Sequence, residues 1–172
     1  MTATTAAPGA AAPPINLRPA TVADIPALVP LLIRLKRLNE EFDPLLRVRP
    51  DVEARAVEVL KRDVASPEAL VLAVEGTGAD AGKVVGIVRA VVRERPFYTP
   101  EKEGVIVDIY LLPLYRRHGV GEHVLEETAA RLKAMGAGIV TADFPVRNEI
   151  AVRFYAKRGF RAITALHARS VV

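Results

Sequence analysis

The sequence predicts an α/β (α+β) domain with a central sheet that is mixed and mostly antiparallel. Two observations predict this class. Helical and β-branched segments alternate in the second half of the chain, which is typical of a right-handed crossover between parallel strands. Earlier, β-branched runs follow one another with only loops between them, which favours antiparallel pairing. The expected order is β-α-α-β-β-β-α-β-α-β, with helices covering the sheet.

The first elements are a short strand at 15–18 and a helix. Thr21 or Asp24 can cap this helix, and Pro30 is expected to bend it. Its apolar stripe includes Ile25, Leu28, Leu31, Leu32 and Leu35. The following segment, LNEEFDPLLRVRP at 38–50, breaks the helical period with two prolines, so we expect an irregular connection there.

The remaining elements follow the same logic. A second helix is expected at about 51–65, followed by the runs ALVLAVE and KVVGIVRAVVR, which a glycine-rich loop joins into a hairpin. The third run, GVIVDIYLL, follows the loop ERPFYTPEKE. A helix then extends to Gly136, the strand AGIVTADF follows, and a last helix runs from about Asn148 to Arg158. The final segment, FRAITALHARSVV, is expected to be a strand.

Length and composition indicate one domain. With 172 residues, 51% of them apolar, the chain can bury a single core, which we assign to residues 15–172. Residues 1–14, MTATTAAPGAAAPP, lack a basic stretch and a strongly apolar one, so we expect a disordered tail. No run reaches the roughly 18 apolar residues of a membrane span. We therefore expect a soluble, cytoplasmic protein without membrane contacts.

Charge and cysteine content exclude further classes. The formal net charge is +4, but basic and acidic residues are interleaved, so nucleic-acid binding is not favoured. The chain has no cysteine, which excludes disulfides, thiolate metal sites and a cysteine nucleophile. The histidines His118, His123 and His167 lack metal-ligand spacing, so no metal site is expected.

The strongest local signal is YRRHGVG, at 115–121, in front of an amphipathic helix. A helix N-terminus exposes unpaired N–H groups and partial positive charge, and glycines let an anion approach them. We interpret this stretch as a cradle for a diphosphate, in which backbone N–H groups are the main donors. The residues assigned to the cradle are Arg116, Arg117, His118, Gly119, Val120 and Gly121. A glycine-containing turn with solvated arginines is the alternative.

A dinucleotide-binding crossover is a competing interpretation of the same glycines. Asp143 lies at about the right distance downstream for a ribose contact. However, the fingerprint G-x-G-x-x-G needs a glycine where this chain has Val124, and it usually occurs in the first strand-to-helix turn of a domain. The spacing therefore argues against this interpretation.

Two spaced motifs resemble those of the GNAT acetyltransferase superfamily. Its pyrophosphate loop reads Arg/Gln-x-x-Gly-x-Gly/Ala, which Arg116, Gly119 and Gly121 match. Downstream, NEIAVRFYAKRGF is similar to the second family motif, Asn-x-x-Ala-x-x-(Phe/Leu)-Tyr followed by Gly-Phe. Because the order of elements also matches, the resemblance extends from Ile15 to about Leu166. It implies acetyl-CoA as acetyl donor, no metal, and transfer of the acetyl group to a primary amine by direct attack on the thioester.

The resemblance also implies where the donor lies. In this family strands four and five splay apart, and the pantetheine arm lies between them. Pro113 cannot donate to a sheet, so strand pairing should fail near it. By the resemblance, the N–H near Leu111 is then the oxyanion donor. A proline that merely ends a strand explains Pro113 equally well.

Tyr155 is the candidate general acid. It lies seven residues, or two helical turns, after Asn148, so both can project over one side of the cleft. A phenol, with a reference pKa of about 10, can protonate a departing thiolate whose thiol has a pKa of about 8.5. Core packing beside Phe154 is the alternative role of Tyr155. For Asn148, the cofactor contact implied by the family and a helix cap are both open.

Asp108 is the candidate general base or amine anchor. It interrupts the apolar run VIVDIY, and a carboxylate in a half-buried strand is costly unless it faces a cleft or a partner. Members of the family often place an acid on this strand. A buried ion pair with Arg89 or Arg93 is the alternative explanation.

Candidates for acceptor binding come from two loops. In the family, the connection between the first two helices borders the acceptor, and here it contains Glu40, Glu41 and Asp43, which would attract a cationic amine. Tyr98 could flank the acceptor as well. The acceptor could be an amine-bearing small molecule, a protein N-terminus or a lysine.

Two further expectations concern function and assembly. A catalytically inactive acetyl-CoA sensor or interaction module on the same fold is the alternative function. A homodimer could form if the apolar final segment AITAL added to a partner's sheet edge.

Overall fold

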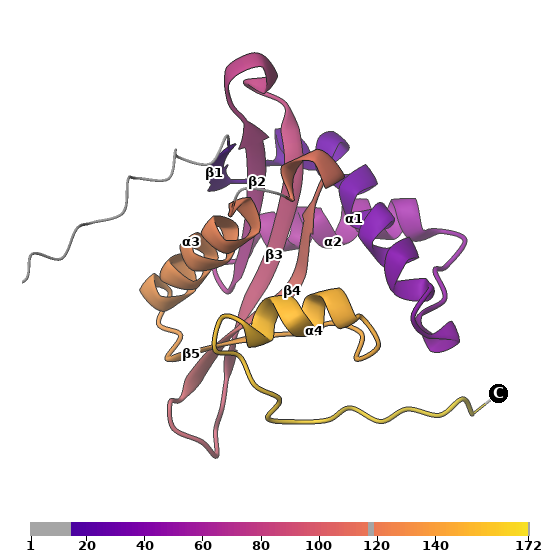
Figure 1. The fold of residues 1–172 in the computed structure, drawn as a ribbon, viewed down its shortest axis with the longest axis vertical. Coiled ribbons are helices and arrows are strands. Elements are labelled where there is room, and N and C mark those ends of the chain that lie inside the picture. Colours follow the sequence, from indigo (N-terminus) through magenta and orange to yellow (C-terminus); the bar gives the residue numbers. More distant parts are fainter. Residues whose placement is uncertain (1–14, 117–118, 172) are drawn as a thin grey trace, which may run out of the picture.

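The structure, a computed structural model, describes residues 15–116 and 119–171. Five strands form one sheet in the order β1-β2-β3-β4-β5 (Figure 1). They are β1 Ile15–Pro19, β2 Ala69–Gly76, β3 Val84–Glu94, β4 Lys102–Leu111 and β5 Ile139–Ala142. The first four strands pair antiparallel, and β4 pairs parallel with β5. This confirms the predicted mixed, mostly antiparallel sheet with one parallel crossover.

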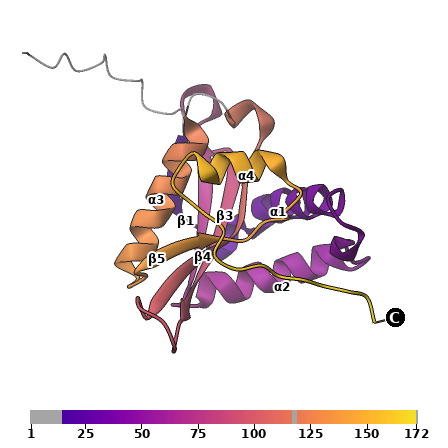
Figure 2. The ribbon, with the colours of Figure 1, turned by 60° about the horizontal axis from the view of Figure 1, so that its bottom comes forward.

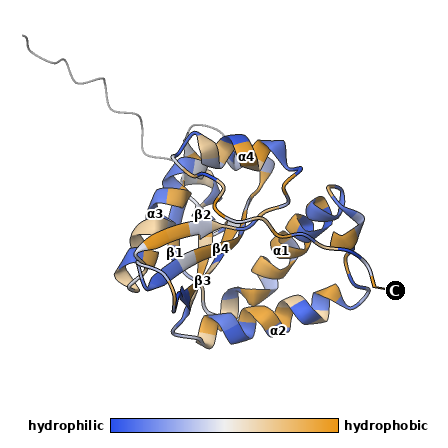
Figure 3. Cartoon of the chain, turned by 90° about the horizontal axis from the view of Figure 1, so that it is seen from below, coloured by the Kyte–Doolittle hydropathy of each residue, from blue (hydrophilic) through white to orange (hydrophobic). Residues whose placement is uncertain are grey.

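Helices cover both faces of the sheet (Figures 2 and 3). They are α1 Ile25–Glu40, α2 Val52–Ala65, α3 Val120–Ala134 and α4 Glu149–Ala156. On one face, buried residues of α1 and α2 form a core with Ile87 and Tyr110 of the sheet. On the other face, Ile106 belongs to a cluster with Leu125 of α3 and Tyr155 of α4. Ile106 and Tyr110 are four residues apart, so regular alternation would place both on one face. The register of β4 against β3 shifts between Asp108 and Ile106, and this bulge directs Ile106 to the other core.

The last predicted strand is wrong. Residues 160–171 form no helix or strand, and Ile163 and Leu166 are 52% and 96% exposed. Figure 1 shows this segment leaving the end of α4 without joining the sheet. Apolar and β-branched residues favour a strand only where a neighbouring strand can pair with them. The sequence has the required propensity here, but the chain does not bring the segment to an edge.

The described part of the chain contains neither a membrane-spanning helix nor a cluster of potential metal ligands. In residues 15–116 and 119–171, no helix is long and apolar enough to cross a bilayer. Within the same ranges, no group of three His, Asp or Glu residues could hold a metal ion.

Candidate active site

The site begins where β4 and β5 part. Their pairing covers only Glu103–Ile106 against Ile139–Ala142, and one more bond follows, from the Asp143 N–H to the Ile106 carbonyl at 3.0 Å. β4 continues to Leu111 without this neighbour. The sequence predicted that pairing between β4 and its parallel neighbour would end near Pro113. It ends earlier, at Ile106, because β5 ends at Ala142. The splayed strand pair is therefore present, and its opening is longer than expected.

The unpaired part of β4 exposes backbone amides toward this opening. The Leu112 N–H donates to the Val85 carbonyl of the neighbouring strand at 2.9 Å. Because alternate residues of a strand direct their amides to opposite neighbours, the amide of Leu111 points to the opposite side, where β5 no longer runs. The Leu111 carbonyl is held by Arg116 Nε at 2.9 Å. The predicted oxyanion donor thus belongs to the open edge of β4.

A narrow cleft of about 60 Å³ adjoins this edge. It brings together three of the predicted site residues: Asp108 from β4, and Asn148 and Tyr155 from α4 and its N-cap. Its other lining residues are Leu35, Asn39, Ile106, Val107, Ile109, Asp143, Phe144, Pro145 and Ala151. α1, β4, the β5–α4 turn and α4 therefore all contribute to it.

Tyr155 is held rigidly by other aromatic rings. It is only 5% exposed, and its ring stacks on Phe144 with centroids 4.9 Å apart and planes 8° apart. Phe154 and Phe160 contact it edge-on. Burial raises the pKa of the Tyr155 phenol well above its ordinary value, because the phenolate would lose its solvation. The side chain is thus packed in the core and also lines the cleft, and it stays protonated at neutral pH.

Asp108 belongs to a buried charge network, which we define as Lys36, Asp63, Arg89 and Asp108. Arg89 Nε donates to Asp108 at 2.7 Å and Arg89 Nη1 to Asp63 at 2.8 Å, while Lys36 Nζ donates to the other oxygen of Asp108. The ion pair with Arg89 that the sequence left open is therefore present, since Arg89 lies directly opposite Asp108 on β3. Burial lowers the pKa of Arg89, but the charge of Asp108 and bonds to both carboxylates outweigh burial and raise it.

The predicted diphosphate cradle lies where β4 leads into α3. Arg117 and His118 fall outside the described residues. Gly119 is the N-cap of α3 with φ of +76°, a conformation that favours glycine, and a Cβ there would meet no atom of the described residues within 4 Å. A helix leaves its first N–H groups without an intrahelical partner, and in α3 these groups begin at Val120.

Two cradle residues have structural contacts as well. The Arg116 guanidinium lies 5.1 Å from the centroid of the Tyr110 ring, in addition to its bond to Leu111. A Cβ at Gly121 would lie 3.2 Å from the Phe154 ring of α4, so the bare backbone allows α3 and α4 to pack closely. The cradle and the helix of Tyr155 are therefore in direct contact.

Asn148 is the N-cap of α4. Its side-chain oxygen accepts a hydrogen bond from the Ala151 N–H at 3.1 Å. The capping role is thus confirmed, and because Asn148 also lines the cleft, a second role toward the cofactor stays a prediction.

Replacing Asn148 with alanine should lower the free energy of unfolding by about 1 kcal/mol, because α4 loses the acceptor for one of its first N–H groups. Urea denaturation measures this change. Asn148→Asp is the matched control, since it keeps the acceptor oxygen and should remain within about 0.5 kcal/mol of the parent. Equal loss in both variants would contradict the cap assignment.

The predicted acceptor residues do not line the cleft. Glu40 ends α1, Glu41 is exposed, and Asp43 accepts a hydrogen bond from the Leu45 N–H at 2.9 Å. Tyr98 lies in the loop between β3 and β4, with the Arg95 guanidinium 5.3 Å from its ring centroid. The connection that carries the acidic residues nevertheless borders the site.

The evidence for this border is a contact to the β5–α4 turn. Arg147 of that turn donates to the Phe42 carbonyl at 3.5 Å. The cleft residues that the sequence interpretation missed are on α1: Leu35 and Asn39 line it, and Lys36 reaches Asp108. Their spacing along one helix face, with a lysine beside an apolar stripe, was the available signal.

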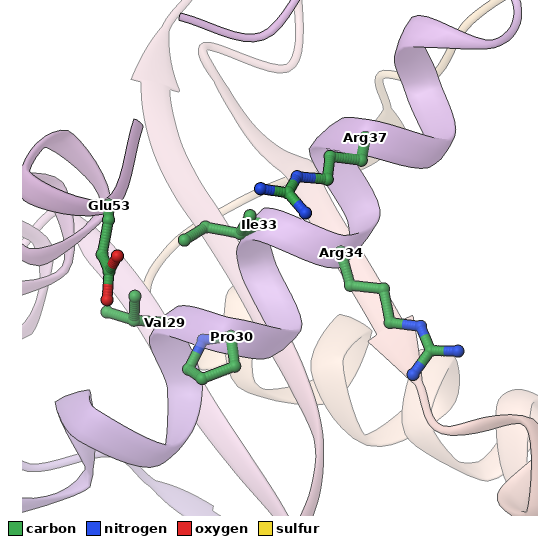
Figure 4. Close-up of a pocket in the computed structure, with 6 residues that line it drawn as sticks. All are labelled: Val29, Pro30, Ile33, Arg34, Arg37 and Glu53. Carbon is green, nitrogen blue, oxygen red and sulfur yellow. The ribbon is translucent and has the colours of Figure 1, made fainter. Parts of the chain in front are cut away.

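A second hollow, of about 420 Å³, lies between α1 and α2 (Figure 4). It is lined by Val29, Pro30, Ile33, Arg34, Arg37 and Glu53. In this view the guanidinium groups of Arg34 and Arg37 point away from each other. None of the predicted site residues lines it, so the chemistry indicated by the sequence belongs to the smaller cleft.

Comparison with known proteins gives one family match. A model described as the acetyltransferase (GNAT) family matches residues 35–160. Among curated proteins, none matches this sequence.

Solved structures resemble the whole fold. A predicted acetyltransferase from Clostridium acetobutylicum, solved with acetyl-CoA, has a TM-score of 0.72 at 16% identity, covering 91% of this chain and 96% of that chain. An aminoglycoside antibiotic 6′-N-acetyltransferase from Acinetobacter haemolyticus has 0.70 at 20%, covering 90% and 97%. A ribosomal-protein-alanine N-acetyltransferase from Brucella melitensis biovar Abortus 2308 has 0.69 at 16%, covering 91% and 99%. At these identities the likeness concerns the fold.

Proposed function

The chain belongs to the acetyltransferase (GNAT) family, and we propose that it transfers an acetyl group from acetyl-CoA to a primary amine by direct attack on the thioester. One observation carries this proposal. A cleft lined by Asp108, Asn148 and Tyr155 adjoins the unpaired edge of β4, and the N-terminus of α3 follows at the end of the same strand. Groups suited to anchor a donor and to move protons therefore converge at one place. We assign this activity to residues 15–172 as one domain.

The residues fit an acetyl donor that has a diphosphate group and an extended arm. The first N–H groups of α3, which a helix leaves without an intrahelical partner, suit a diphosphate, and the positive φ of Gly119 turns the chain into the helix without a side chain. The unpaired edge of β4 can hydrogen-bond an extended arm as an added strand would. When bound, acetyl-CoA supplies an acetyl group on a thiol leaving group. No metal has a role in this scheme.

Each reacting group has a proposed role. Tyr155 donates a proton to the leaving sulfur, the Leu111 N–H stabilises the developing oxyanion, and Asp108 anchors the amine or accepts its proton. The phenol is suited to donate because its raised pKa keeps it protonated. The contacts of Asp108 favour an anchoring role, since its two oxygens already accept hydrogen bonds from the cations Arg89 and Lys36.

The acceptor is proposed to be an amine-bearing small molecule, a protein N-terminus or a lysine. The two structural neighbours with named activities acylate an aminoglycoside and a ribosomal protein, and those substrates are theirs. Glu40, Glu41 and Asp43 lie on the connection that borders the cleft and would attract a cationic amine. A cytoplasmic location suits a protein that uses acetyl-CoA.

We expect acetyl-CoA to bind with a saturable heat in titration calorimetry at micromolar to millimolar concentrations. A panel of small amines, N-terminal peptides and lysine peptides should then identify an acceptor that accelerates release of free thiol. Saturable binding without thiol release for any acceptor would instead indicate the inactive acetyl-CoA sensor. Absence of binding at millimolar acetyl-CoA would overturn both functions.

A further inference from the structure

Lys36 lies next to the proposed acetyl-transfer cleft and contacts one of its lining residues. It lies on α1 between Leu35 and Asn39, which both line the cleft, and its Nζ donates to Asp108 on the cleft floor. The Asp108 side chain is fully buried, whereas that of Lys36 is 36% exposed. The Lys36 side chain is therefore held at its tip by the ion pair and is partly exposed to solvent.

The other lysines whose ion pairs are described lie elsewhere. Lys83 pairs with Asp80, and Lys102 with Glu94. Lys61 and Lys133 are exposed on α2 and α3. Within residues 15–116 and 119–171, Lys36 is thus the lysine whose ion pair involves a residue lining the cleft.

Lys36 also occupies the position that an acceptor amine would need. Asp108 accepts a hydrogen bond from Arg89 with one oxygen and from Lys36 with the other, so an acceptor ammonium group would compete with Lys36 for the same oxygen. The protein thus holds a primary amine of its own against Asp108, which lines the cleft together with Tyr155.

From this geometry we infer that Lys36 is an acetylation site, modified by the protein's own acetyl-transfer cleft. The inference rests on the proposed function, because the acetyl donor is acetyl-CoA. Lys36 loses one ammonium proton to Asp108 or solvent, and its neutral nitrogen attacks the thioester carbonyl carbon. The carbon–nitrogen bond forms and the carbon–sulfur bond breaks. The sulfur leaves with the Tyr155 proton, and solvent restores that proton while the second proton of the nitrogen is released.

Acetylation of Lys36 changes the charge of the cleft. The buried charge network has two carboxylates, Asp63 and Asp108, and two cations, Arg89 and Lys36. Converting the ammonium to a neutral amide removes one positive charge from beside the cleft and frees an oxygen of Asp108 from its ion pair. The modified protein therefore attracts a cationic acceptor more strongly than the unmodified protein does.

The test is peptide mass spectrometry of the full chain after incubation with acetyl-CoA at pH 8 without an acceptor. We expect Lys36 to be acetylated at least tenfold faster than exposed Lys61 and Lys133, at a first-order rate independent of protein concentration. Tyr155→Phe should slow acetylation of Lys36 and leave Lys61 and Lys133 unchanged. Acetyl phosphate, a donor without CoA, should show no preference for Lys36.

The outcomes separate this inference from the proposed function. Acetylation of Lys36 no faster than that of Lys61, or unaffected by Tyr155→Phe, overturns the inference. If acetyl-CoA binds in calorimetry and an added amine is acetylated while Lys36 is not, the inference alone fails. If acetyl-CoA does not bind, the proposed function fails as well. Lys36→Arg keeps the ion pair without an acylable amine, and should abolish the fast phase in intact-mass measurements.

Discussion

Replacing Arg89 with methionine lowers the free energy of unfolding by about 3 kcal/mol or more, because it leaves two buried carboxylates without the cation they share. The Arg89 side chain is 13% exposed, and its guanidinium donates to Asp63 and to Asp108. Uncompensated buried charge is more costly than the loss of a surface pair. We expect a loss close to about 3 kcal/mol, because Lys36 still pairs with Asp108 and Arg62 still pairs with Asp63.

Arg93→Met is the matched control for this variant. Arg93 lies on the same strand, is exposed, and should change the unfolding free energy by less than about 0.5 kcal/mol. Urea denaturation with a common m-value measures both variants. If Arg89→Met were as mild as Arg93→Met, Arg89 would not stabilise the buried carboxylates.

The sheet and its helices were predictable because local patterns and tertiary contacts agree. β-branched runs became β2, β3 and β4, and the crossover through α3 led to parallel β5. The cleft was predictable for a related reason: Asn148 and Tyr155 are fixed by one helix, and a charged residue at Asp108 within an apolar strand needs a partner. The two explanations of Asp108 are not exclusive, since it both pairs with Arg89 and lines the cleft.

The failures also have physical causes. The final segment has strand propensity, but pairing requires an available edge, and residue pattern alone does not reveal whether the chain returns to one. Lys36 was missed because lysines on a helix beside apolar residues are usually solvated, and its contact with Asp108 depends on the packing of α1 against β4. Contacts between elements that are distant in the sequence determine both whether the final segment forms a strand and where the Lys36 side chain lies.

Replacing Tyr155 with phenylalanine should lower turnover with any acceptor more than tenfold, while the dissociation constant of acetyl-CoA stays nearly unchanged. The substitution removes the phenolic oxygen, so the leaving sulfur loses its proton donor. The ring stays in place, because the stacking on Phe144 and the edge contacts of Phe154 and Phe160 involve carbon atoms that phenylalanine retains. Steady-state kinetics gives turnover, and titration calorimetry gives binding.

Tyr110→Phe is the control for loss of a buried tyrosine hydroxyl. The Tyr110 hydroxyl is buried without a hydrogen-bond partner in the described structure, so its removal should leave turnover unchanged.

A pH profile adds a second test. Burial raises the pKa of Tyr155, so the phenol stays protonated as the pH rises past the ordinary tyrosine value of about 10. Turnover of the parent should therefore not fall between about pH 8 and 10 through loss of this proton. Unchanged turnover in Tyr155→Phe would remove Tyr155 from proton transfer and leave it a packing residue.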